Sequence, residues 1–197
     1  MLRWKSKIWL RLLLALVLWP TAAPAAEFSA TIVDRMGDDE RTGKIYLQGE
    51  KGRQELATEK GDAVIISRPD KKVMWFLFPG KKAFIEKPLD ITNWLVGMEW
   101  SKYRTQWKSL GTETLHGYET RKYEVEVKGK GATAKNHVWV AKKLDTPIKI
   151  ATPDGEFSLE FRDIKEGVVS ADLFEIPPGY QKMGASSGEG KWYAPSR

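Results

Sequence analysis

The stretch that decides the fold is Ile65–Lys87, which reads IISRPDKKVMWFLFPGKKAFIEK. It holds three short apolar runs separated by two turn signals, Pro69-Asp70 and Pro79-Gly80. Proline presets the backbone angle of a turn and glycine tolerates a positive φ, so both signals are expected to reverse the chain. Apolar runs of this length that are rich in aromatic and β-branched residues are typical of strands. The stretch therefore predicts an antiparallel meander of three strands.

The middle run, Val73–Phe78, is apolar at every position. Side chains of a strand alternate between its two faces, so one face receives Val73, Trp75 and Leu77 and the other receives Met74, Phe76 and Phe78. A sheet with one face in water would instead alternate apolar and polar residues. Both faces of this strand must therefore be covered by other parts of the chain.

Strand-like runs and turn signals continue on both sides of the meander. Turns recur about every ten residues, which favours a sheet, sandwich or barrel over alternating helices and strands. Further strands are expected at 28–33, 42–47, 53–58, 107–115, 118–127, 134–141, 147–151 and 157–162. The last apolar stretch, Leu173–Tyr180, is expected to close the core.

One segment follows a helical period. Ile91, Trp94, Leu95 and Met98 are spaced i, i+3, i+4 and i+7, which is the apolar stripe of an amphipathic helix, and Asp90 is a suitable N-cap. The pattern resumes at Trp100, so one or two short helices are expected between residues 90 and 106. Because this segment follows the meander directly, we predict that it covers one face of the sheet.

The chain begins with the pattern of an export signal. Basic residues (Arg3, Lys5, Lys7 and Arg11) precede the apolar run Leu12–Trp19 and the small-residue cleavage pattern Ala23-Pro24-Ala25. The apolar run is far shorter than the roughly 20 residues of a spanning helix. We predict a signal peptide at 1–25 with cleavage after Ala25, a periplasmic domain at 26–182, and a disordered Gly- and Ser-containing tail at 183–197.

Composition excludes several classes of protein. The chain has no cysteine, which rules out disulfides, thiolate metal sites and a lipid-modified N-terminal cysteine. Its net charge of +6 includes four leader bases, and their removal leaves 28 basic against 26 acidic residues, or +2. Bases and acids are interspersed, so we expect no nucleic-acid partner. The two histidines, His116 and His137, lie in no catalytic or metal-binding motif, so we expect neither an enzyme nor a cofactor or metal.

The aromatic residues allow two interpretations, a filled core or an apolar ligand cavity beneath the helical cover. For the cavity, the predicted lining is Trp75, Leu77 and Phe84 on the sheet side, and Ile91, Trp94, Leu95, Met98 and Trp100 on the cover side.

Four phrases resemble a known family: TGKIY (42–46), RPDKKV (68–73), GTETLHGY (111–118) and LFEIPPGY (173–180). They look like the exported bacterial DUF4412 proteins, which are similar to the outer-membrane lipoprotein-sorting group of the LolA carrier and LolB receptor. The resemblance implies a mainly β (α+β) fold, an open antiparallel half-barrel of about 9–11 strands with a short helical lid over an apolar cavity. It transfers no catalytic residue.

These observations lead to a non-catalytic periplasmic protein that binds or carries an acyl chain or a lipidated protein, and that acts as a monomer. A peripheral contact with a membrane stays open. The alternative is an envelope sensor or scaffold that binds another protein and has no ligand cavity, since one fold supports both.

Overall fold

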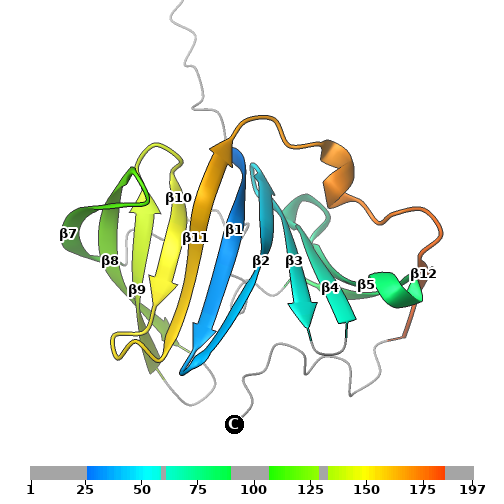
Figure 1. Ribbon diagram of the computed structural model, residues 1–197, viewed down its shortest axis with the longest axis horizontal. Coiled ribbons are helices and arrows are strands. Elements are labelled where there is room, and N and C mark those ends of the chain that lie inside the picture. Colours follow the sequence, from blue (N-terminus) through cyan, green and yellow to red (C-terminus); the bar gives the residue numbers. More distant parts are fainter. Residues whose placement is uncertain (1–25, 59–60, 90–106, 129–132, 185–197) are drawn as a thin grey trace, which may run out of the picture.

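The computed structural model describes residues 26–58, 61–89, 107–128 and 133–184 (Figure 1). All strands of this part belong to one twelve-stranded sheet. The strands are β1 (Glu27–Met36), β2 (Asp39–Gln48), β3 (Lys51–Thr58), β4 (Gly61–Arg68), β5 (Val73–Phe78), β6 (Ala83–Pro88), β7 (Lys108–Leu115), β8 (Tyr118–Lys128), β9 (Thr133–Ala141), β10 (Thr146–Ala151), β11 (Phe157–Glu166) and β12 (Gln181–Lys182). The described ranges also contain the 3-10 turns η1 (Pro69–Lys71), η2 (Pro79–Lys81) and η4 (Ala171–Phe174).

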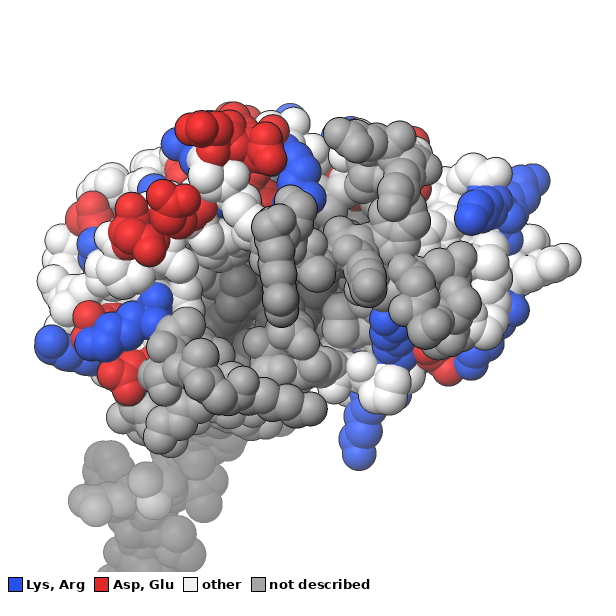
Figure 2. Space-filling model, turned by 90° about the horizontal axis from the view of Figure 1, so that it is seen from below, with Lys and Arg blue, Asp and Glu red and all other residues white. Residues whose placement is uncertain are grey.

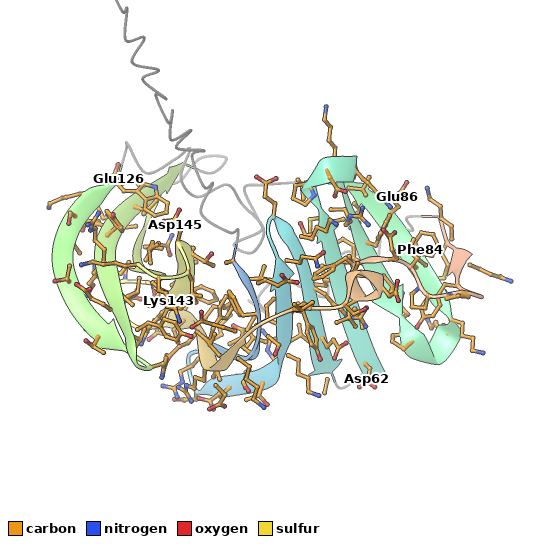
Figure 3. The ribbon with its side chains drawn as sticks, turned by 90° about the horizontal axis from the view of Figure 1, so that it is seen from above. Asp62, Phe84, Glu86, Glu126, Lys143 and Asp145 are labelled. Carbon is orange, nitrogen blue, oxygen red and sulfur yellow. The ribbon has the colours of Figure 1, made fainter. Side chains whose placement is uncertain are left out.

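The sheet is an open meander that is joined in its middle. Its strand order is β12-β6-β5-β4-β3-β2-β1-β11-β10-β9-β8-β7. The first long strand, β1, pairs antiparallel with both β2 and β11, and so connects the two halves of the sheet. Seen from above, the two halves curve away on either side of this junction, with Phe84 in one half and Lys143 in the other (Figure 3). The mainly β fold and the open, antiparallel sheet are as predicted, but the sheet has twelve strands where about 9–11 are expected. Among the described strands only the short β12 pairs parallel, with β6.

The three strands of the deciding stretch lie where the sequence predicts them, as β4, β5 and β6. Their two turns share one geometry, in which a proline opens a 3-10 turn and a lysine closes it in the left-handed region: Lys72 at φ 57° and Lys82 at φ 45°. The lysine N–H donates to the proline carbonyl in each turn, at 3.1 and 3.0 Å. The sequence favours Gly80 for the positive φ of the second turn, but the structure has it at Lys82.

The two faces of β5 belong to two separate apolar clusters. Trp75 and Leu77 pack with Val64, Ile66 and Phe84, and we call this side of the sheet the Trp75 face. Met74 packs in a second cluster against which Phe76 lies, and we call that side the Phe76 face. The alternation predicted for this strand is therefore confirmed.

The chain's own C-terminal segment covers the Trp75 face. After β11 the chain crosses the Trp75 face, where η4 contacts β3 and β4. Phe174 of η4 packs into the cluster on this face and has no exposed surface. Val169 is also buried there, and Leu173, Ile176 and Tyr180 pack around the cluster. The segment then joins the edge of the sheet, since the N–H groups of Gln181 and Met183 donate to carbonyls of β6 and of the residue before it. This cover is a 3-10 turn with extended chain.

The predicted helical lid falls on residues 90–106 and lies outside the described residues, as does the tail from residue 185 onward. Met183, with which the predicted disordered tail begins, donates its N–H to the Phe84 carbonyl at 2.8 Å. The last strand, β12, ends at Lys182, and this one hydrogen bond follows it; the domain boundaries stay a prediction.

Gly43 in β2 marks a close approach between two strands. A Cβ at this position would lie 2.2 Å from the Glu55 carbonyl oxygen and 2.9 Å from Leu56 Cδ2. We expect Gly43→Ala to lower the free energy of unfolding by about 2–3 kcal/mol, because β3 has to move away. Urea denaturation would measure the loss.

The matched control is Gly80→Ala, because a Cβ there meets nothing within 4 Å. This variant should stay within about 0.5 kcal/mol of the wild type. Equal stability of the two variants would contradict the close packing of β2 on β3.

Candidate functional site

The predicted cavity residues separate into two groups. Trp75, Leu77 and Phe84 come together on the Trp75 face, with exposed fractions of 6, 1 and 9%. They share their cluster with Phe174 and Val169, so the C-terminal segment occupies the space directly above them. The other five predicted residues, Ile91, Trp94, Leu95, Met98 and Trp100, lie outside the described residues. The cavity itself stays a prediction, but its sheet side must be sought on the other face.

The Phe76 face is apolar across most of the sheet. Strand register places one row of neighbours on it: Phe76, Ile65, Gln54, Ile45 and Ala30. The adjoining row continues through the other half: Leu159, Ile150, Val138 and Tyr123. No second sheet lies over this face in the part of the chain that the structure describes, because all of its strands belong to one sheet.

The two described residues that flank segment 90–106 both pack on the Phe76 face. Leu89 packs against the cluster that contains Ile65 and Met74, and its N–H donates to the Lys72 carbonyl at 3.0 Å. Trp107 packs against the cluster of Val138 and Tyr123, with ring centroids 5.4 Å apart from Tyr123. The chain thus leaves β6 and enters β7 on the same side of the sheet.

Few polar groups interrupt this face. Gln54 is buried between Ile45 and Ile65 on the neighbouring strands. Toward one end Arg41 donates to Asp34 at 2.6 Å and leaves the other Asp34 oxygen, Oδ1, buried without a partner. The Phe76 face is thus apolar with isolated polar groups, and we call it the apolar floor. Such a surface is suited to hydrocarbon rather than to a highly charged ligand.

A charged cluster around Glu160 lies on the opposite side of β11. Glu160 contacts His116 and Arg162 through Oε1 and Lys149 through Oε2, and its side chain is only 10% exposed. Burial raises the pKa of Glu160, but the His116 hydrogen bond and the Lys149 and Arg162 charges outweigh burial and lower it. Both oxygens of this carboxylate are paired and its pKa is lowered, which makes it a weak proton acceptor.

The described residues contain no group of three or more His, Asp or Glu side chains that could hold a metal ion. A surface depression of about 410 Å³ is lined by Gly117, Tyr118, Glu119, Lys142, Lys143 and Glu166. Its charges are paired, with Lys143 2.6 Å and the Tyr118 hydroxyl 2.9 Å from Glu166. Seen from below, acidic and basic side chains lie interspersed around the described rim, the mixed pattern expected from the sequence (Figure 2).

Arg68 fastens the C-terminal segment to the Trp75 face. Its guanidinium is 5% exposed, forms two hydrogen bonds of 2.8 and 2.7 Å to Asp70, and donates to the Phe174 carbonyl at 2.9 Å. Arg68 also pairs with Oε1 of Glu175. The other oxygen, Oε2, accepts a hydrogen bond of 2.9 Å from Lys71 Nζ. In the sequence Arg68 stands out only as part of a turn phrase, because nothing local indicates a contact with a residue 106 positions away.

No helix in the described ranges has both the length and the apolar character needed to cross a bilayer. The described residues form a single open antiparallel sheet with an apolar face, which is the fold that the resemblance to LolA/LolB-like proteins implies. The chain belongs to the family described as Domain of unknown function (DUF4412), whose model matches residues 31–147. No curated protein matches it.

Several solved structures are similar to this chain at low sequence identity. An uncharacterized conserved protein from Thermus thermophilus is 14% identical, with 81% of this chain and 90% of that chain covered and a TM-score of 0.56. MucB is 13% identical, with 80% of this chain and 59% of MucB covered and a TM-score of 0.50. The matching chain of the Pseudomonas aeruginosa MucA/MucB complex is 11% identical, with 79% of this chain and 57% of that chain covered and a TM-score of 0.49.

The ion pairs of Arg68 with Asp70 and Glu175 make the stability of the folded protein depend on pH. The hydrogen bond from Arg68 lowers the pKa of Asp70 from 3.8 to about 2. A depressed pKa in the folded state stabilises the protein above pH 4, and this contribution disappears as the pH falls toward 2. Asp70→Asn should therefore cost about 1 kcal/mol at pH 6, limited by solvent screening of a half-exposed carboxylate, and almost nothing near pH 2.

Unfolding free energies of the wild type and this variant at pH 6, 4 and 2.5 would test the convergence. Asp62→Asn is the control, since Asp62 is exposed and forms none of the Arg68 contacts. A difference between wild type and Asp70→Asn that stays constant over this pH range would contradict the assignment.

Proposed function

We propose that this protein is an exported, non-catalytic binding or carrier protein of the cell envelope, and that it holds an acyl chain of a lipid or lipidated protein on its Phe76 face. One observation carries the proposal: Leu89 and Trp107, which flank segment 90–106, both pack on this face. The opposite face is filled by the chain's own residues. A ligand would therefore lie between segment 90–106 and the apolar floor.

The floor supplies the affinity through the hydrophobic effect. An acyl chain that buries about 300 Å² of apolar surface gains on the order of 7 kcal/mol at about 25 cal/mol per Å². Phe76, Ile65 and Ile45 are the central floor residues in this proposal. Ile45 and Ile65 have exposed fractions of 0 and 1%, so binding requires that their present cover be displaced by the acyl chain. Trp75, Leu77 and Phe84 support the same strands from behind, where they pack under the C-terminal segment.

The apolar stripe of segment 90–106 supplies the other side of the site. Ile91, Trp94, Leu95 and Met98 recur at helical spacing, and Trp100 follows them. An envelope location is supported by the leader pattern of residues 1–25 and by the LolA/LolB-like fold. The same fold could present this face to another protein, which is the sensor or scaffold alternative.

The test is native mass spectrometry of protein purified from the periplasm without detergent, with titration of a fatty acid and of a lipopeptide. We expect co-purifying lipid in the wild type. The double variant Leu95→Ser, Met98→Ser should bind at least tenfold more weakly, because each change removes apolar surface from the stripe.

Val168→Ser is the matched control, since Val168 is 93% exposed just after β11 and contributes to neither face. A wild type that carries no lipid, and that binds neither probe, would refute the proposal. A protein partner captured in the complete absence of lipid would then favour the sensor or scaffold function.

A further inference from the structure

A second inference concerns the Trp75 face and does not depend on ligand binding at the Phe76 face. Residues Val169–Ile176, which we call the C-terminal arm, lie against β2–β5 without forming a backbone ladder with them. We infer that the sheet side of this contact is a peptide-recognition site, filled here by the chain's own arm. Its partner in trans is an extended peptide with a large aromatic residue directly followed by a carboxylate.

Side chains of the sheet form four hydrogen bonds with the main chain of the arm, one of which is the contact of Arg68 with the Phe174 carbonyl described above. Gln48 donates to the Val169 carbonyl at 2.9 Å, and the Val169 N–H donates to Glu27 at 2.8 Å. Arg53 donates to the Leu173 carbonyl at 3.0 Å. Contacts to backbone groups are independent of the side chains that a peptide carries, so they would hold any extended segment in this register.

Two features give the site its sequence preference. The first is the apolar pocket of Ile66, Trp75 and Leu77, in which Phe174 loses all of its exposed surface. The second is the basic pair Arg68 and Lys71, which binds the two oxygens of Glu175. Asp70 holds the Arg68 guanidinium by two hydrogen bonds, and both cations also lie over the Trp75 ring, at 5.7 and 5.0 Å.

The connection between β11 and the arm consists of two residues, Gly167 and Val168. Gly167 has φ 139°, where a side chain would be strained, and Val168 is 93% exposed. This linker can be cut without removing any of the contacts described above. At the other end Gln181 and Met183 bind the edge of β6, so a cut chain retains a second anchor.

The experiment uses the full chain with a site-specific protease sequence inserted between Gly167 and Val168. After cleavage we expect the C-terminal fragment to co-elute with the sheet, and a labelled synthetic peptide of residues 168–183 to replace it, as followed by fluorescence anisotropy. The same peptide with Phe174→Ala should bind at least tenfold more weakly, and with Glu175→Gln about threefold more weakly.

The control carries the same insertion between Asp154 and Gly155, in the exposed β10–β11 turn, where cleavage leaves the arm attached. It should bind far less peptide. Unfolding of the protein on cleavage at residue 167, failure of excess peptide to replace the fragment, or equal binding of the Phe174→Ala peptide would each overturn the inference. Lipid binding at the Phe76 face can be measured separately on the uncut protein.

Hydrogen exchange on the uncut wild type gives a measurement that needs no insertion. If the arm is a bound ligand, the amides of Val169, Leu173 and Glu175 should exchange through local opening at least tenfold faster than those of β4 and β5. Equal protection of the arm and of these strands would show that the arm opens only when the whole sheet unfolds, and would also overturn the inference.

Discussion

The structure depends on one constraint: β5 is apolar on both faces, and neither face can remain in water. The protein covers the Trp75 face with its own C-terminal arm, whose Phe174 is fully buried. The Phe76 face extends across both halves of the sheet, and the flanks of segment 90–106 are anchored on it. The two faces are therefore covered differently. One is closed by residues that belong to the fold, and the other is the side on which we propose that an external apolar group is held.

Covering an apolar face with an arm requires that the backbone of the arm be satisfied, and the Trp75 face does this with polar side chains at its margins. Arg53 and Arg68 donate to arm carbonyls that would otherwise lack partners next to the apolar cluster. Arg68 is itself nearly inaccessible, and a buried cation is tolerated only with compensating charge. Asp70 and Glu175 provide that charge, one from the turn after β4 and one from the arm.

Much of the sheet could be predicted from the sequence, because strand alternation and turn signals are local. The strands around Val73–Phe78 and the assignment of Trp75 and Phe76 to opposite faces follow from a period of two. Local patterns could not predict which segment covers the Trp75 face. Burial of Trp75 depends on Phe174, and the register of that contact is set by Arg68 and its acceptors, which are remote in sequence. The positive φ of Lys72 and Lys82 was also missed, since lysine carries no turn signal.

The pairing of β1 with β11 has a consequence for how the chain reaches this state. Thr31 of β1 donates to Asp163 of β11, 132 residues further on, so the central junction is among the most distant contacts in the molecule. Loop-closure entropy makes such contacts slow to form. During synthesis, which starts at the N-terminus, β1 can pair with β2 early. It stays unpaired on its other side until β11, near the end of the sheet, has been synthesised. Throughout that interval the exposed edge of β1 is open to association with other chains, and a chaperone would be most useful there.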